Sequence, residues 1–349
     1  MARGERFSPE TRRWMERLFP EGLPALWCPP LTHYAGAGVL DAPRMRAHLA
    51  SMLPWVRGLL VPGSTGEAWE MSAAEVRELL AFFVEEIRGR GVHLLVGALH
   101  AEAADAVRQI HETVAWLRRV TGADDAAEAL VRASVCGFAV CAPRGAGLGQ
   151  ERIRAALDEV LSIGVPIALY QLPQVTQNEI APETAAALSA RHPNFYLFKD
   201  SSGADRVAAS GFRGAFLVRG AEGDYARQLA ERGGPYDGYL LSTANCFGRQ
   251  LAAMIEQIRR GETGAPDAFS RELSAICAEL LGPAGAVGYG NAFANTNKAL
   301  DHYFAHGPEA AGRVEPPLLH SGRRLPRDVV DLAGASLRRH GLMPARGYL

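Results

Sequence analysis

Apolar and polar residues occur along this chain in blocks rather than in residue-by-residue alternation. Short apolar runs end in Gly, Pro or small polar residues, and stretches rich in Ala, Leu, Glu and Arg separate them. Because an apolar run without polar alternation is typical of a strand covered on both faces, the blocks predict a parallel sheet with crossover helices. The predicted strands are 25–28, 58–62, 94–98, 137–141, 166–170, 196–199, 216–219 and 238–241.

Eight such strands and their helices span about 240 residues. This length matches that of the (β/α)8 TIM barrel, an α/β fold. A doubly wound open sheet is the alternative, but its usual GxGxxG turn after the first strand is not present. Beyond the eighth strand, helical periodicity predicts a C-terminal helical region packed on the barrel or on a neighbouring subunit. The predicted parts are an N-terminal extension at 1–22, the barrel at 23–248 and the helical region at 249–349. The predicted helices of the C-terminal region are 250–260, 265–281, 291–306 and 327–340, with an irregular connection at 307–326.

The composition narrows the classes of function. Of 349 residues, 48% are hydrophobic and 21% are charged, which argues against a disordered chain or a coiled coil. A net charge of -1 provides no field to attract nucleic acid or an anionic membrane, so a small-molecule partner is expected. Five cysteines without CxxC spacing predict reduced core thiols. Since we find neither a signal sequence nor an apolar stretch long enough to cross a bilayer, we expect a cytoplasmic location.

Lys199 is the most informative residue, because it closes the apolar run 195–198. An ammonium group among apolar side chains loses hydration, so its pKa falls and free amine able to attack a ketone appears near neutral pH. The strand at 166–170 ends in the same manner at Tyr170, whose phenol can pass protons to and from the adduct. The C-terminal ends of neighbouring barrel strands lie within reach of one substrate carbon, so the pair predicts Schiff-base chemistry. The alternative is a strand-end lysine whose head reaches water.

A loop after the second strand reads GSTGE, from Gly63 to Glu67. Its two glycines allow unusual backbone angles, so that N–H groups and hydroxyls can converge on a carboxylate. With this loop, Tyr170 and Lys199, the chain resembles the dihydrodipicolinate synthase and N-acetylneuraminate lyase superfamily, the pyruvate-type class I aldolases built on a (β/α)8 barrel. The segments that carry the resemblance are GSTGE at 63–67, YQLP at 170–173, FKDSSG at 198–203 and GYLLSTAN at 238–245.

The resemblance implies that Lys199 condenses with the keto group of pyruvate or a related 2-oxo acid, and that Tyr170 is the general acid and base. Ser64 is implied to relay protons to Tyr170. Ser64 and Thr65, together with Gly63 of the same loop, are implied to bind the carboxylate of the 2-oxo acid.

Gly220 and Leu240 match positions that the family keeps close to the bound pyruvyl unit. A protonated imine is itself an electron sink, so this chemistry requires no metal and no organic cofactor. The implied partners are a 2-oxo acid, an aldehyde and further copies of the chain in a homotetramer or homodimer.

Two departures from the family's pattern concern the rest of the substrate. The family's PYY segment is replaced by Ala142-Pro143-Arg144-Gly145, so that the tyrosine completing the hydroxyl relay is missing. Water, Arg144 or another loop substitutes for it, or the chemistry demands less proton transfer; Arg144 is also a candidate to bind a distal carboxylate, phosphate or sugar hydroxyl. Val175 stands where dihydrodipicolinate synthases have an arginine for aspartate semialdehyde, which argues against that activity.

Three functions therefore stay open: reversible aldol cleavage or condensation, dehydration of a sugar-derived 2-keto acid, and a 2-oxo-acid-binding protein without turnover. The joint retention of Lys199, Tyr170, Ser64 and Thr65 argues against the third.

Overall fold

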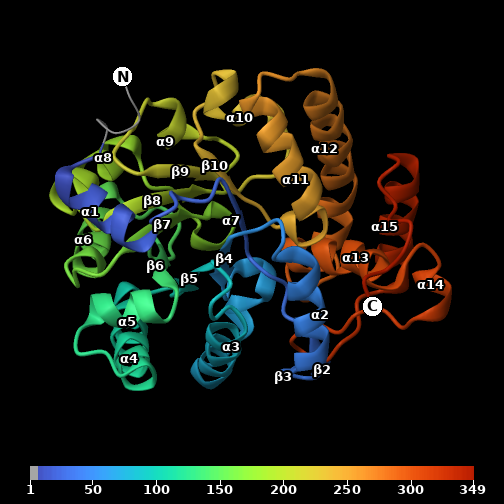
Figure 1. Ribbon diagram of the computed structural model, residues 1–349, viewed down its shortest axis with the longest axis horizontal. Helices are drawn as coiled ribbons and strands as arrows, with labels where there is room; N and C mark the ends of the chain where they lie inside the picture. The colour runs from blue at the N-terminus through green and yellow to red at the C-terminus, as the bar shows by residue number, and fades with distance from the viewer. Residues whose placement is uncertain (1–6) are drawn as a thin grey trace. The chain divides into compact units, whose positions relative to one another are not determined.

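In the computed structural model, which describes residues 7–349, strands and helices alternate as the sequence predicts (Figure 1). Within these residues eight parallel strands close a barrel, and each lies beside the next barrel strand along the chain. The fold is therefore the predicted TIM barrel and not an open sheet. The barrel strands are β1 (Leu26–Cys28), β4 (Gly58–Val61), β5 (His93–Gly97), β6 (Val135–Cys141), β7 (Ile167–Gln171), β8 (Phe195–Asp200), β9 (Phe216–Arg219) and β10 (Gly238–Leu240).

The observed strands overlap the predicted ones, and their ends differ by two residues at most. Burial explains this agreement. Every residue of β6, β7 and β8 is buried, so both faces of these strands require apolar side chains and the apolar run marks the strand directly.

The helices of the outer layer begin and end where the sequence supplies caps. α2 (Ala42–Met52) starts behind Asp41, whose side chain accepts a hydrogen bond from the Arg44 N–H. α4 (Ala103–Thr121) ends at Gly122, which has the left-handed conformation typical of a C-cap. The segment 121–132 contains a short additional helix, α5 (Ala126–Arg132), which packs on α4. The other helices of this layer are α3 (Ala73–Glu86), α6 (Gln150–Leu161), α8 (Pro182–Arg191), α9 (Arg206–Ala209) and α10 (Tyr225–Gln228). The four-residue α7 (Pro173–Thr176) lies in the loop that follows β7.

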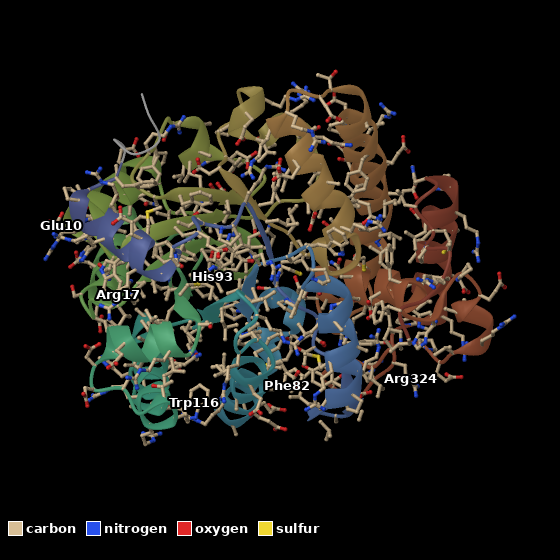
Figure 2. All side chains as sticks on the ribbon, in the orientation of Figure 1. Glu10, Arg17, Phe82, His93, Trp116 and Arg324 are labelled. Carbon is tan, nitrogen blue, oxygen red and sulfur yellow. The ribbon has the colours of Figure 1, made fainter. Side chains whose placement is uncertain are left out.

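The N-terminal extension contains α1 (Pro9–Leu18), and residues 1–6 of the extension lie outside the described residues. Phe19 follows this helix and is 2% exposed. Its ring packs on His93 at the start of β5, at 4.7 Å between ring centroids, and on Tyr196 of β8 at 5.8 Å; His93 is labelled in Figure 2. The extension thus covers the N-terminal ends of two barrel strands.

Helices also fill the C-terminal region, as predicted: α11 (Ala244–Arg259), α12 (Gly264–Gly285), α13 (Ala292–His306) and α15 (Arg327–Arg339). α12, α13 and α15 pack on one another (Figure 1). α11 begins six residues earlier than predicted and is kinked at Phe247. The irregular connection contains the four-residue α14 (Ala310–Arg313) and an isolated bridge between Leu318 and Arg324.

The described chain forms two compact units. The first comprises residues 7–25, 83–221 and 233–240, and it holds β5 to β10. The second comprises residues 26–82, 222–232 and 241–349, and it holds β1, β4 and the C-terminal helices. It also contains a short antiparallel pair that the sequence did not predict, β2 (Tyr34–Gly36) and β3 (Val39–Leu40). None of the helices in residues 7–349 is both long and apolar enough to cross a membrane.

Candidate active site

Lys199 and Tyr170 meet at the C-terminal ends of two neighbouring strands. β7 and β8 pair with Tyr170 opposite Lys199, and Cys141 of β6 lies opposite Tyr170. The Lys199 Nζ is 3.8 Å from the centroid of the Tyr170 ring. Lys199 is only 4% exposed and Tyr170 2%. The structure thus brings together the two residues predicted to carry the chemistry, with the amine held against an aromatic face.

The rarity of lysine in this chain also draws attention to Lys199. The 37 basic residues include just two lysines, Lys199 and Lys298, and the rest are arginines. Both lysines are buried, at 4% and 1% exposure. A lysine can lose its proton or fit a compact site, whereas an arginine stays charged and needs room for a planar group. This signal in the sequence singles out Lys298 as well, a residue for which the motifs predicted no role.

Gly220 follows β9 and lies against the Lys199 side chain. Its N–H donates to the Asp200 carbonyl oxygen at 2.6 Å. A Cβ at this position would lie 2.8 Å from Lys199 Cε, well inside the carbon–carbon contact distance of about 3.5–4.0 Å. Leu240 ends the neighbouring strand β10 and is fully buried. A side chain larger than that of glycine at this position would therefore displace the Lys199 side chain.

Carboxylates organise the loop after β8. The N–H and hydroxyl of Ser202 donate to Asp200 Oδ1 at 2.9 and 2.6 Å, and burial raises the pKa of Asp200. Asp205, in the left-handed region at φ 54°, pairs with Arg219 at 3.2 Å. The Tyr236 hydroxyl donates to the same carboxylate at 2.7 Å. These contacts fasten the loop to the end of β9 and to the segment before β10.

Arg144 and Val175, the two departures from the family's pattern, lie in contact. Arg144 is exposed on the loop after β6, and its Nε donates to the Val175 carbonyl oxygen at 3.2 Å. The Asn178 side chain donates to the carbonyl oxygens of Pro143 and Gly145, at 2.7 and 3.1 Å. The loop that lacks the family's tyrosine is therefore tied to the loop that lacks its arginine.

The GSTGE loop presents hydrogen-bond donors. Gly63, Ser64 and Thr65 lie in a tight turn after β4, and Ser64 and Thr65 are 5% and 3% exposed. Within residues 7–349, the backbone N–H groups of Ser64 and Thr65 have no protein acceptor. Trp69 donates from Nε1 to Ser64 Oγ at 2.9 Å, which leaves the Ser64 hydroxyl hydrogen to donate elsewhere. Buried donors without a partner suit an anion such as a carboxylate.

Glu67 ends this loop and is anchored in the interior of its unit. Its φ of 63° is left-handed, and its N–H donates to the Ser64 carbonyl oxygen at 3.1 Å. The carboxylate is 1% exposed, forms an ion pair with Lys298 of α13 and accepts the His320 N–H at 2.9 Å. Lys298 also donates to the Leu318 carbonyl oxygen at 2.8 Å. Burial lowers the pKa of Lys298, and the Glu67 carboxylate opposes that shift.

Glu222 is a further carboxylate, and sequence reasoning did not identify it. Ser242 Oγ and the Thr243 N–H donate to its Oε1 at 2.6 and 3.1 Å. Thr243 Oγ1 and the Tyr225 hydroxyl donate to its Oε2 at 2.8 and 2.7 Å. Four donors thus hold Glu222 at the start of α11, and two of the donor residues belong to the GYLLSTAN segment.

A buried cluster of His33, His48 and Asp301 has the donor types of a metal site, with ligand atoms within 4.8 Å of one another. Asp301 is already paired with Arg44 and accepts a hydrogen bond from the Tyr348 hydroxyl at 2.8 Å. Although burial favours the neutral acid, Arg44 holds the pKa of Asp301 well below its usual range. A divalent cation would face that guanidinium, so these residues fit an ion-pair cluster and not a metal site.

Known proteins of one family are similar to this chain in sequence and in fold. The pattern of the Dihydrodipicolinate synthetase family matches residues 123–287. The 4-hydroxy-tetrahydrodipicolinate synthase of Xanthomonas campestris pv. campestris is 30% identical over 247 residues, which cover 70% of this chain and 75% of that protein.

Solved structures share the fold. YagE, a prophage protein of the dihydrodipicolinic acid synthase family from E. coli K12, solved in complex with pyruvate, has a TM-score of 0.68 at 18% identity. The match covers 92% of this chain and all of that one. The 2-keto 3-deoxygluconate aldolase from Picrophilus torridus has a TM-score of 0.62 at 17% identity, over 78% of this chain and 91% of that one. The solved structures show the fold, and the relative at 30% identity together with the family match shows that the chain belongs to the dihydrodipicolinate synthase family of class I aldolase-type lyases.

Proposed function

We propose that this protein forms a Schiff base between Lys199 and pyruvate or a related 2-oxo acid, and that it catalyses reversible aldol cleavage or condensation. The observation that carries the proposal is the buried contact between the Lys199 amine and Tyr170 at neighbouring strand ends. Burial favours the neutral, nucleophilic form of an amine, and a phenol beside it can exchange protons with the adduct.

In the cleavage direction, Lys199 Nζ attacks the keto carbon, and the resulting carbinolamine loses its hydroxyl as water with a proton from Tyr170. The iminium then accepts the electron pair of the bond between carbons 3 and 4. That bond breaks as the 4-hydroxyl proton passes to Tyr170, an aldehyde leaves, and an enamine remains. Protonation of carbon 3 and hydrolysis of the imine release pyruvate and regenerate the amine.

The GSTGE loop is the proposed site for the 2-oxo-acid carboxylate. The support is the set of donors at Ser64 and Thr65, two backbone N–H groups and the Ser64 hydroxyl. A carboxylate bound by such donors keeps its charge, and charge-assisted hydrogen bonds of this kind are about twice as strong as neutral ones. Gly220 and Leu240 are proposed to bound the pyruvyl unit, and Ser64 is proposed to assist proton transfer at Tyr170.

The other half of the substrate is proposed to differ from aspartate semialdehyde. Val175 offers no guanidinium, and the exposed Arg144 is the cation that the structure places at the same pair of loops. An aldehyde with a distal anionic or hydroxyl group suits Arg144 as a donor. Self-association as a homotetramer or homodimer is part of the proposal, and light scattering measures it.

Borohydride reduction in the presence of pyruvate, followed by peptide mass analysis, tests the proposal. The expected result is an adduct on the peptide containing Lys199 and none on the peptide containing Lys298. Lys199→Met should abolish trapping, and Tyr170→Phe should slow turnover by about 10²–10⁴-fold, the usual contribution of a general acid or base. Absence of an adduct with pyruvate and with every other 2-oxo acid tried would refute the Schiff base.

Turnover assays separate the alternatives that share the Schiff base. Release of pyruvate from 4-hydroxy-2-oxo acids indicates an aldolase, and loss of water with an intact carbon chain indicates a dehydratase. Trapping without turnover of any substrate indicates a 2-oxo-acid-binding protein.

A further inference from the structure

We propose that Lys298, on the C-terminal helix α13, is a positioning residue for the 2-oxo-acid carboxylate. It acts through Glu67, which it anchors so that the GSTGE loop (63–67) keeps its donors in place. This inference rests on the function proposed above and adds a residue outside the motifs that define it.

Lys298 has a site built for an ammonium group. It is 1% exposed, and its Nζ donates to Glu67 Oε2 and to the Leu318 carbonyl oxygen at 2.8 Å. The Nζ also lies 4.6 Å from the centroid of the Tyr34 ring. Two oxygens and an aromatic face account for the three N–H bonds of the ammonium. In a chain whose basic residues other than Lys199 and Lys298 are arginines, a compact cation occurs here because the partners surround a single nitrogen.

Glu67 connects this anchor to the carboxylate donors. Its backbone is left-handed, which costs a non-glycine residue free energy and persists only where surrounding contacts impose it. The contacts are Lys298 on one carboxylate oxygen and the His320 N–H on the other. The Glu67 N–H in turn closes the turn on the Ser64 carbonyl oxygen. Loss of the anchor would therefore release the turn that orients the N–H groups of Ser64 and Thr65.

A second contact from the same helix reaches the loop. Asn291, which caps α13, donates from Nδ2 to the Ser64 carbonyl oxygen at 2.9 Å, while its Oδ1 accepts the Ala294 N–H. Asn291 and Lys298 are seven residues apart, a spacing that places both on one face of a helix. α13 thus holds the loop at its start through Ser64 and at its end through Glu67.

Membership of the two compact units makes the proposal specific. Lys199 and Tyr170 belong to the first unit, and the GSTGE loop, Lys298 and α13 belong to the second. Loss of Lys298 should therefore weaken the binding of the 2-oxo acid and leave the reactivity of bound 2-oxo acid nearly intact. A role limited to stability would change neither quantity in the protein that stays folded.

The experiment measures the rate of borohydride trapping against pyruvate concentration in wild type and three variants. Lys298→Met should raise the half-saturating pyruvate concentration about tenfold or more, as expected for the loss of one charge-assisted hydrogen bond. Asn291→Ser, which keeps an oxygen for the helix cap and loses the donor to Ser64, should raise it about threefold. The extrapolated rate at saturation should stay within about threefold of wild type in both variants.

Arg44→Met is the matched control, because it breaks an ion pair with the buried Asp301 of the same helix, and the Arg44 guanidinium donates to Asp301 and Tyr348 and not to the GSTGE loop. It should lower the melting temperature as Lys298→Met does and leave half-saturation unchanged. An unchanged half-saturation in folded Lys298→Met overturns the proposal, and so does an equal rise in Arg44→Met. If Lys298→Met does not fold, a wild-type value in Asn291→Ser overturns it. Absence of trapping in wild type itself refutes the proposed function instead.

Discussion

Replacement of Gly220 by alanine should slow Schiff-base formation while the protein stays folded. The backbone at this position is not left-handed, so an alanine is conformationally allowed and the obstacle is space. The added Cβ would lie 2.2 Å from Ser201 Oγ, 2.8 Å from Lys199 Cε and 3.4 Å from the Asp200 carbonyl oxygen. The Ser201 hydroxyl can rotate away and the contact with Asp200 is close to normal, so the Lys199 side chain is the group that must move.

The size of the effect follows from that distance. To restore ordinary contact from 2.8 Å, Lys199 Cε must move by about 1 Å. Nζ is bonded to Cε and therefore moves with it, away from its buried place against the Tyr170 ring. A misplacement of about 1 Å costs about 100-fold in rate, or about 2.7 kcal/mol in the barrier. Overpacking of this kind costs about 1–3 kcal/mol of stability, less than the roughly 5–15 kcal/mol that keeps a domain folded.

The assay is the rate of borohydride trapping at saturating pyruvate, with circular dichroism to establish folding. Gly282→Ala in α12 is the control, since a Cβ there meets no atom within 4 Å and alanine favours a helix. The double variant Gly220→Ala, Ser201→Ala removes the hydroxyl clash and retains the clash with Lys199, so it should remain slow. A wild-type rate in folded Gly220→Ala would refute the reasoning that space at this glycine fixes the amine.

Further predictions concern stability and reactivity. Lys298→Met leaves Glu67 buried without its cation, so it should lower the free energy of unfolding, measured in urea, by about 3–5 kcal/mol. Adding Glu67→Gln should restore part of this loss, and a loss below about 1 kcal/mol would contradict the buried ion pair. Burial lowers the pKa of His33 below 6.5, so the unfolded state binds this proton at higher pH than the folded state, and stability should fall as the pH decreases below about 6.5. His33→Gln should flatten this dependence of the melting temperature on pH, and an unchanged profile would exclude His33 as its source. Burial raises the pKa of Cys136 and Cys141 to about 12, so these thiols should react with Ellman's reagent only after unfolding, and rapid labelling of the native protein would show otherwise.

The barrel could be predicted from sequence because its strands are marked locally. β6, β7 and β8 are buried along their whole length, and such strands read as near-continuous apolar runs. The β2–β3 pair has no such mark, since Val39 is 58% exposed and the two strands together contain five residues. Its formation depends on contacts that a pattern of apolar residues does not encode.

The candidate site divides in the same way. Lys199 and Tyr170 could be found because each closes a buried run. The pairing of Glu67 with Lys298 joins residues 231 positions apart, so no local periodicity reveals it. The sequence singles out Lys298 only through composition. A rare lysine among many arginines indicates a site that a guanidinium group does not fit.

The contact between Arg144 and Val175 changes how the two departures from the family's pattern should be understood. Considered separately, one removes a tyrosine from the loop after β6 and the other an arginine from the loop after β7. In the structure the Arg144 Nε donates to the Val175 carbonyl oxygen, so a guanidinium carried by the neighbouring loop lies beside the backbone of Val175. Under the proposed function, a cation supplied from a different backbone would reach the substrate at a different angle and depth, which would change the aldehyde that is selected and leave the chemistry at Lys199 untouched. We therefore propose that the protein keeps the capture of a 2-oxo acid and differs from the 4-hydroxy-tetrahydrodipicolinate synthases in the second half of its substrate.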